Sequence, residues 1–312
     1  MDIGEFELIG RISAASAVPE GMTGIGDDCA ILPQKSGRDT LVSTDMLVEG
    51  VHFLLSDVSP ADLGWKSAVV NISDIAAMGG RPVATFLSLA LPAGVNSAWA
   101  DSFIGGYTSA CSRFGAPLLG GDTSSSPDRV CINVTVLGEC PSGRALMRSG
   151  ARPGDLVCVT GCLGDSAAGL KVILEGLERS ADAAALVQRH YRPVPRVSEG
   201  LALAACPGVH AMMDISDGVA SDLGHILDAS GVGADLEASS LPLSSELRSL
   251  CALKGWDPLP LAAGGGEDYE LLFTMAPDAC PDIPHTVIGR ITAQCGLRWN
   301  GLESTVRGFR HF

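Results

Sequence analysis

The sequence contains little positive charge. Only four of its 312 residues are lysine, and 21 Lys+Arg stand against 36 Asp+Glu, which gives a formal net charge of -15. Polyanionic partners are held mainly by basic side chains, so this balance argues against nucleic acid and against anionic membrane surfaces. A phosphate-handling protein of this composition would need metal cations to supply the missing positive charge.

The sequence also lacks the marks of export and of membrane insertion. Its longest apolar run, "VATFLSLAL" at 83–91, is far too short to span a bilayer. The opening "MDIGEFELIG" is acidic and has no basic region followed by an apolar one. The ten cysteines form no C-x-x-C pair, which argues against a zinc site or a disulfide framework. We therefore expect a cytoplasmic protein with reduced thiols and no membrane partner.

The familiar nucleotide-binding motifs are missing as well. "GWKS" at 64–67 has no glycine directly before its lysine, so it is not a Walker A loop, and it falls within a helical pattern. "GIGDDC" at 24–29 lacks the third glycine of a dinucleotide-binding fingerprint, and its two aspartates would repel an unscreened pyrophosphate. Protein-kinase signatures are also not found.

What the sequence does contain is typical of a two-domain globular protein. The chain is 46% hydrophobic and 18% charged, and it is long enough for two cores of ordinary size. Gly, Pro and Arg cluster without periodicity at 139–155, as in an interdomain connection. We expect a mixed α/β protein with domains at 1–150 and 151–312.

Apolar spacing predicts helices and short strands in both halves. Ser59 followed by Pro60 predicts the start of a helix that runs to about Met78 and carries Asn71 and Asp74. A second helix is predicted at 96–114. Strands are predicted at 30–32, 41–43, 83–91, 130–136, 156–161 and 210–214, and "APLLGGDTS" at 116–124 predicts a strand that runs into a Gly-Gly-Asp turn.

Acidic residues recur beside Gly, Ser or Thr at the predicted strand ends and turns. The set comprises Asp27, Asp28, Ser43, Thr44, Asp45, Asp74, Gly121, Asp122, Asp214, Ser216 and Asp217. Any one of them can cap a helix or shape a turn with no ligand present. The set forms five groups along the chain, at 27–28, 43–45, 74, 121–122 and 214–217. Together they favour a site where loops converge and where Mg2+, which prefers oxygen ligands, bridges carboxylates and phosphate.

Seven motifs, distributed along the whole chain, resemble those of the thiamine-monophosphate kinase family. They are "GIGDDCAIL", "STDMLVEGVHF", "KSAVVNISDIAAMGGRP", "GGDTS", "RSGARPGD", "MMDISDGVASDL" and "GGGEDYELLF". The resemblance implies a two-domain α/β (α+β) fold like that of aminoimidazole ribonucleotide synthetase. It further implies a homodimer whose N-terminal domain sheets pair, with ATP and Mg2+ bound between this domain and a C-terminal α/β domain.

The resemblance also assigns roles to individual residues. Mg2+ ligation would fall to Asp28, Ser43, Thr44, Asp45, Asp74, Asp122, Asp214 and Asp217, with Asp27 beside them. ATP would be contacted by Gly121, Asp122, Arg148 and Ser216, and thiamine monophosphate by His52, Glu267 and Phe309, or Phe312 in place of Phe309. Asp45, Arg148 and Asp217 would act in catalysis. A cationic thiazolium beside a flat aminopyrimidine gives a carboxylate and an aromatic ring a physical reason to be there.

The implied reaction is transfer of the ATP γ-phosphoryl group to the phosphate of thiamine monophosphate. A phosphate monoester is largely dianionic at pH 7, so no general base is required. We expect direct in-line transfer dominated by positioning and charge neutralisation. Cys29 is explained by packing. The alternatives are a metal-dependent phosphohydrolase, a sister synthetase that acts on a ribonucleotide amide oxygen, and a binding scaffold without turnover.

Overall fold

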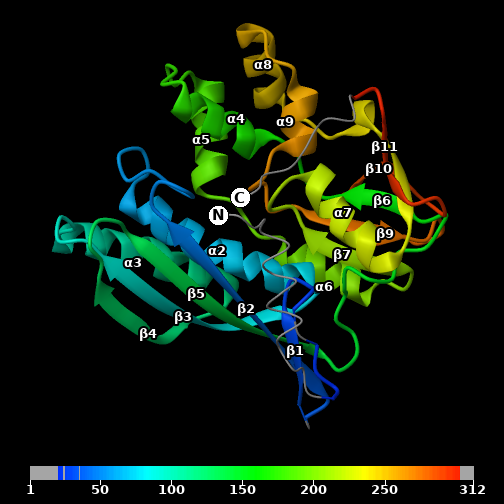
Figure 1. Ribbon diagram of the computed structural model, residues 1–312, viewed down its shortest axis with the longest axis horizontal. Coiled ribbons are helices and arrows are strands. Elements are labelled where there is room, and N and C mark those ends of the chain that lie inside the picture. Colours follow the sequence, from blue (N-terminus) through cyan, green and yellow to red (C-terminus); the bar gives the residue numbers. More distant parts are fainter. Residues whose placement is uncertain (1–19, 24, 35, 303–312) are drawn as a thin grey trace, which may run out of the picture.

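The computed structural model describes residues 20–302 except residues 24 and 35. It contains two sheets joined by a shared layer of helices (Figure 1). The five-stranded sheet has the order β1-β2-β5-β3-β4 and the six-stranded sheet the order β11-β8-β10-β6-β9-β7. The expected mixed α/β architecture is confirmed.

The N-terminal half supplies the five-stranded sheet and two long helices. Its elements are β1 (Ala30–Pro33), β2 (Arg38–Val48), α2 (Pro60–Ala77), β3 (Arg81–Leu91), α3 (Ser97–Phe114), β4 (Leu118–Ser125) and β5 (Cys131–Pro141). Helix α2 begins as predicted, because the Ser59 hydroxyl accepts the N–H of Asp62 and Pro60 occupies the first turn. It ends at the predicted Met78, which caps it.

Helices α2 and α3 cover one face of this sheet and pack closely against each other. A Cβ on Gly64 would lie 2.0 Å from the carbonyl oxygen of Phe103, and one on Gly106 would lie 1.9 Å from that of Ala61. The two glycines therefore permit backbone contact between the helices. The other face of the sheet is open in the described chain, where Met46 is 59% exposed and Phe86 is 36% exposed.

The C-terminal half supplies the six-stranded sheet and the remaining helices. Its elements are β6 (Leu156–Val159), α4 (Asp165–Leu174), α5 (Ala181–Tyr191), α6 (Val197–Ala205), β7 (Val209–Asp214), α7 (Val219–Ser230), β8 (Gly233–Glu237), η1 (Ala238–Ser240), α8 (Ser245–Lys254), α9 (Pro258–Gly264), β9 (Leu271–Met275), β10 (Thr286–Thr292) and β11 (Gly296–Asn300). Helix α7 packs on one face of this sheet through Leu223 and Ile226. Leu203 of α6 and Ala77 at the end of α2 pack on the other face.

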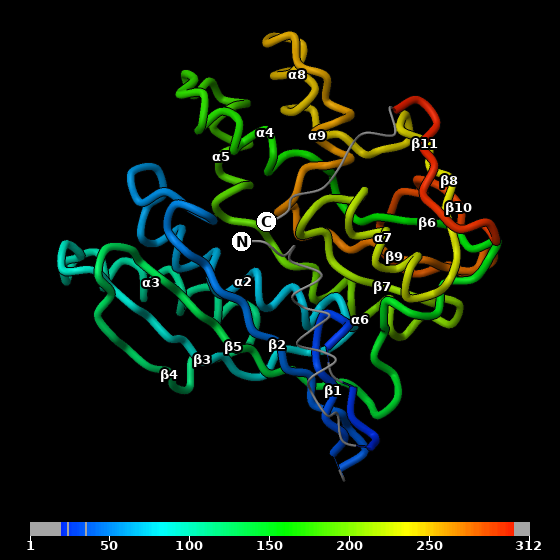
Figure 2. Tube along the Cα trace, in the orientation of Figure 1, coloured from blue at the N-terminus to red at the C-terminus, as the bar shows by residue number. Residues whose placement is uncertain are grey.

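Helix α2 thus lies between the two sheets, as the trace in Figure 2 also shows. A single apolar cluster joins it to both halves, because Leu63 and Val69 of α2 pack with Leu186 of α5 and Leu247 of α8. Side chains on α2 can therefore contact residues of both halves of the chain. Within the described residues, no helix combines the length and apolar character needed to cross a bilayer.

Two predicted local structures are wrong. The strand predicted at 41–43 extends from Arg38 to Val48, so Ser43, Thr44 and Asp45 lie inside β2 and not at its end. Gly121 and Asp122 were predicted on a turn, but they continue β4, in which Asp122 pairs with Ser88 of β3. Parallel pairing with β3 outweighs the turn preference of the Gly-Gly-Asp sequence.

Candidate active site

Four aspartates from distant parts of the chain meet beside α2. Oxygens of Asp28, Asp74 and Asp214 lie within 4.8 Å of one another. Asp28 comes from the loop before β1, Asp74 from α2 and Asp214 from the end of β7. Asp45 of β2 interacts electrostatically with all three. We call Asp28, Asp45, Asp74 and Asp214 the acidic cluster.

Three members of the acidic cluster resist ionisation. Burial, and then repulsion from Asp28, raises the pKa of Asp45 to about 6 and that of Asp214 to about 7. Burial followed by repulsion from Asp45 and Asp214 raises the pKa of Asp74 well above its ordinary value. A divalent cation reverses both effects, because it compensates the lost hydration and screens the like charges.

The donor set fits such a cation. Among the described residues, Oδ2 of Asp28 is a buried carboxylate oxygen with no hydrogen-bond partner. Hard cations such as Mg2+ are bound through carboxylate oxygens of this kind, usually with water and substrate phosphate completing the shell. The acidic cluster can therefore hold Mg2+.

Neighbouring polar groups orient the acidic cluster. The Ser43 hydroxyl donates to Oδ2 of Asp74 at 2.5 Å, and the Ser73 hydroxyl donates to Oδ2 of Asp214 at 2.5 Å. The Asn71 side-chain oxygen accepts the N–H of Asp45 at 3.1 Å. Thr44 differs from these residues because its hydroxyl is on the opposite face of β2, where it donates to the carbonyl of Val134. Only the main chain of Thr44 can face the acidic cluster.

Arg148 closes the acidic cluster from the connection between the two halves. Its Nη2 lies 2.8 Å from Oδ1 of Asp28. The main-chain N–H of Arg148 donates to Oδ1 of Asp27 at 3.0 Å. The Nε atom of Arg148 is buried without a hydrogen-bond partner among the described residues. Burial, and then repulsion from Asp28, raises the pKa of Asp27 to about 6. A guanidinium in this position can stabilise additional negative charge next to the acidic cluster.

Ser216 and Asp217 occupy the turn between β7 and α7, next to Asp214. A single oxygen of Asp222 accepts three successive backbone N–H groups, those of Ser216 and Asp217 at 3.1 Å and that of Gly218 at 2.9 Å. Asp222 is 1% exposed, so it fixes the turn from inside the protein. Our sequence analysis missed Asp222, although an acidic residue in the first turn of a helix often caps the preceding loop.

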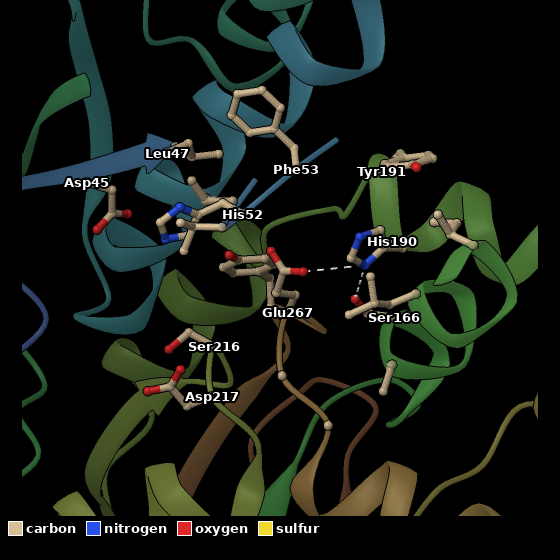
Figure 3. A pocket seen from close by; sticks show the side chains of 18 of the residues that line it. Asp45, Leu47, His52, Phe53, Ser166, His190, Tyr191, Ser216, Asp217 and Glu267 are labelled. Carbon is tan, nitrogen blue, oxygen red and sulfur yellow. Dashed lines mark hydrogen bonds and ion pairs between the residues drawn. The ribbon is translucent and has the colours of Figure 1, made fainter. Parts of the chain in front are cut away.

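A cavity of about 770 Å³ opens beside the acidic cluster (Figure 3). Asp45, Asp74, Asp214, Ser216 and Asp217 line its acidic end. Apolar and aromatic side chains line the rest, among them Leu47, Phe53, Leu170, Leu174 and Tyr191. The cavity therefore combines a charged end with an apolar body, which is the form of a site for a flat organic molecule that carries phosphate.

Two residues predicted to bind substrate, His52 and Glu267, line this cavity from opposite halves of the chain (Figure 3). Nδ1 of His52 accepts the N–H of Val48 at 3.0 Å, so a neutral His52 ring carries its proton on Nε2. Glu267 lies in the loop before β9 and has φ 65°, which is unusual for a residue other than glycine.

Glu267 belongs to a buried network that our sequence analysis missed. Nζ of Lys66 in α2 lies 2.8 Å from its Oε1, and Nδ1 of His190 in α5 lies 3.4 Å from its Oε2. Burial alone would raise the pKa of Glu267, but the positive charge of Lys66 holds it below its ordinary value. Burial, and then the charge of Lys66, lowers the pKa of His190 to about 3. Lys66 occurs in "GWKS" and begins the motif "KSAVVNISDIAAMGGRP", but neither pattern indicates a distant partner for its side chain.

Two predicted positions, Gly121 and Asp122, are not brought to the acidic cluster of their own chain. Gly121 and Asp122 lie on β4, and three strand spacings, about 14 Å, separate this strand from β2 across the sheet. Phe309 lies outside the described residues, as does its alternative, Phe312. Cys29 is 2% exposed and packs in the core beside Ile72 and Ile75, in agreement with the packing interpretation.

Comparisons with known proteins give a consistent result. Residues 26–140 match the family model "AIR synthase related protein, N-terminal domain", and residues 152–298 match the corresponding C-terminal domain. The chain is 42% identical to the thiamine-monophosphate kinase of Salmonella typhimurium over 330 residues, which cover 100% of this chain and 99% of that protein. It is also 42% identical to the Bacillus subtilis thiamine-monophosphate kinase over 281 residues, which cover 87% and 83% of the two chains. A solved structure of AaThiL complexed with AMPPCP and TMP superposes with a TM-score of 0.92 at 38% identity, covering 100% of this chain and 98% of that one.

Proposed function

This chain belongs to the thiamine-monophosphate kinase family of AIR synthase related proteins, and we propose that it carries out its reaction with Mg2+ bound at the acidic cluster. It catalyses the ATP-dependent phosphorylation of thiamine monophosphate to thiamine diphosphate. The observation that carries the magnesium proposal is the position of the acidic cluster at one end of the cavity.

Asp28, Asp45, Asp74 and Asp214 would hold the metal, together with Ser43, Asp217 and the main chain of Thr44. The bound ions would neutralise charge on the ATP phosphates. Ser216, on the turn that Asp222 fixes, would position the nucleotide, and Arg148 would stabilise the negative charge of the transferred group. These residues favour direct in-line transfer, because the substrate phosphate is already ionised and needs no base.

The part of the cavity lined by His52 and Glu267 would receive the thiamine part of the substrate. Glu267 offers a carboxylate that its neighbours keep ionised, and Nε2 of His52 offers a donor when the ring is neutral. The apolar and aromatic lining suits flat rings. Phe309, or Phe312, would add an aromatic face from outside the described residues.

We further propose that the chain acts as a homodimer formed through the five-stranded sheet. The open face of this sheet exposes Met46 and Phe86, and all of β4 except Leu118 is exposed. Exposed apolar surface of this kind on a sheet is typical of an interface. Because Asp122 lies across the sheet from its own acidic cluster, Gly121 and Asp122 would serve the nucleotide site of the partner subunit. In this proposal, residues 1–150 bind ATP and Mg2+ and form the dimer, and residues 151–312 complete the site.

One incubation tests the proposed chemistry. Purified protein with ATP, Mg2+ and thiamine monophosphate should yield thiamine diphosphate and an equal amount of ADP. Phosphate release without an acceptor would indicate a phosphohydrolase, transfer to a ribonucleotide amide would indicate a sister synthetase, and binding without turnover would indicate a scaffold. Analytical ultracentrifugation tests the dimer, and loss of turnover on Asp122→Asn with unchanged assembly tests the assigned role of Asp122.

A further inference from the structure

Lys66 is a buried cation with no role in the chemistry described so far. It lies in the middle of α2, and its side chain is 1% exposed. Lysine is almost never buried to this extent unless it is paired. Its partner is Glu267, from a loop far along the chain, with Nζ 2.8 Å from Oε1. The ion pair therefore joins a helix of the N-terminal half to a wall of the cavity built by the C-terminal half.

The backbone at Glu267 is fixed in an uncommon conformation. Glu267 has φ 65° and Tyr269 has φ 51°, both in the left-handed region that non-glycine residues rarely adopt. The N–H of Glu267 donates to the carbonyl of Ser216 at 2.8 Å, and that of Tyr269 donates to the carbonyl of Ile215 at 2.9 Å. The loop is thus attached to the same turn that carries Ser216 and Asp217.

A second attachment fixes the loop from the other side. Oδ2 of Asp268 accepts the N–H of Gly164 at 2.6 Å, and Oδ1 accepts that of Ser166 at 3.1 Å. Asp268 therefore ties the loop to the first turn of α4. With the backbone held at both flanks, the direction of the Glu267 side chain depends on the groups that meet its carboxylate.

Those groups come from three elements. Lys66 faces the carboxylate from α2, His190 faces it from α5, and His52 contributes from the segment after β2. His190 is neutral at ordinary pH, because burial and Lys66 lower its pKa to about 3, and it shares a hydrogen bond of 2.9 Å with the hydroxyl of Ser166. Lys66 is therefore the strongest counter-charge to Glu267.

We propose that Lys66 is a positioning residue for substrate recognition, which holds the Glu267 carboxylate as an oriented anion against the cavity. This inference rests on the proposed function, in which Glu267 receives a cationic heteroaromatic ring that carries an amino group. Lys66 supplies no contact to the substrate. It sets the charge and the direction of the residue that does.

The consequence concerns affinity for thiamine monophosphate and not phosphoryl transfer. Without Lys66, burial dominates at Glu267 and favours its protonated form, which cannot attract a cation. The KM for thiamine monophosphate should rise about tenfold or more, the loss expected for a charge-assisted hydrogen bond. The KM for ATP and kcat should change little, because the acidic cluster is untouched.

The decisive measurement is the ratio of KM for thiamine monophosphate between Lys66→Met and the parent enzyme from pH 6 to pH 8.5. Taking the ratio cancels the titration of the substrate phosphate. We expect the ratio to grow as pH falls, since Glu267 takes up a proton in the variant and stays ionised in the parent. Lys66→Arg, which restores a cation, should return the ratio to a flat profile.

Controls separate positioning from general damage. Lys254→Met removes an exposed lysine at the end of α8 and should leave both KM values unchanged. Glu267→Gln should raise KM with a flat ratio, and the double variant should lose no more than Glu267→Gln alone. Should Lys66→Met melt below assay temperature, Lys66→Gln replaces it with the same expected ratios.

A flat ratio for Lys66→Met, or a double variant whose loss equals the product of the single losses, overturns the proposal. A parent enzyme that forms no thiamine diphosphate refutes the proposed function instead. In that case, a double-mutant cycle of Lys66→Met and Glu267→Gln in urea unfolding still decides whether the two side chains are coupled.

Discussion

Replacing Asp45 by Asn should make the metal-free protein more stable while it abolishes turnover. Asp45 lies in β2 against the other three aspartates of the acidic cluster, and its pKa is raised from 3.8 to about 6. A raised folded-state pKa means that the native protein binds the proton more tightly than the unfolded chain does. The corresponding stability is fully present below about pH 4 and is lost as pH rises through about 6.

The size of this effect follows from the shift. The pKa of Asp45 is higher by about 2 in the native protein than in the unfolded chain, which corresponds to roughly 3 kcal/mol of lost stability at pH 8. This is an upper value, because the four carboxylates share their protons. The amide introduced by Asp45→Asn has no charge to bury, so the metal-free variant should resist urea better than the parent enzyme at pH 8. Below about pH 4 this advantage should vanish, because Asp45 is then protonated in both states of the parent.

Magnesium should reverse the order of stability of the parent enzyme and the Asp45→Asn variant. Titration with Mg2+ should stabilise the parent enzyme strongly and the variant much less, since a cation that binds only the native state adds stability in proportion to its affinity. Turnover should fall at least about a hundredfold. Urea unfolding with and without Mg2+ at pH 4 and pH 8, together with an ADP-release assay, measures all three effects.

An exposed carboxylate provides the matched control. Asp278→Asn changes the same atoms in an exposed residue after β9 and should alter neither the pH dependence nor the response to Mg2+. An Asp45→Asn enzyme with nearly full activity and an unchanged response to Mg2+ would remove Asp45 from the metal site. Loss of stability at pH 8 in the metal-free variant would contradict the electrostatic argument.

Three further predictions concern the supports of the site. Asp222→Ala leaves three backbone N–H groups of the Ser216 turn without their acceptor, so the KM for ATP should rise about tenfold, as steady-state kinetics would show; an unchanged KM would mean that the turn does not contact nucleotide. His190 has a pKa lowered to about 3, so the stability it confers is present above about pH 6.5 and declines as pH falls toward 3. Between pH 7 and pH 4, the free energy of unfolding of His190→Asn should therefore fall by about 3 kcal/mol less than that of the parent, as urea unfolding would show. An equal fall in the two proteins would contradict burial as the cause of the lowered pKa. Gly106→Ala forces a methyl group onto the carbonyl of Ala61 and should cost at least about 1–3 kcal/mol, whereas Gly105→Ala, with no atom within 4 Å of its added Cβ, should cost nothing; similar effects of the two changes would refute the close contact between α2 and α3.

Much of the fold followed from local patterns. The start of α2 at Ser59-Pro60 and the loop that carries Asp27 and Asp28 agree with the sequence prediction, and the strands predicted at 83–91 and 156–161 correspond to β3 and β6. Each has a strong local cause, a cap or a run of apolar residues. The extent of β2 and the course of β4 were wrong because pairing with β5 and β3 decides them, and such pairing leaves no mark in the strand itself.

The site divides in the same way. Asp28, Asp74 and Asp214 were predicted as one group, and the structure brings them together. Acidic residues beside small ones are visible in the sequence, at predicted turns for Asp28 and Asp214 and on a predicted helix for Asp74. Lys66, His190 and Asp222 were missed because each acts through a partner that only the tertiary structure reveals. The metal, ATP and substrate roles, the domain boundary near Gly150 and the dimer stay predictions that the proposed experiments address.

Because α2 is shared between both halves, the two cannot be exchanged independently between related enzymes. A chimaera joined near residue 150 would inherit its helix from one parent and the surfaces that enclose it from the other, including the loop that meets Lys66. A chimaera should fold and be active only when α2 and the residues that face it from α5, α6 and the segment before β9 come from the same parent. The practical unit of inheritance in this protein is a helix with its surroundings, and it does not coincide with either half of the chain.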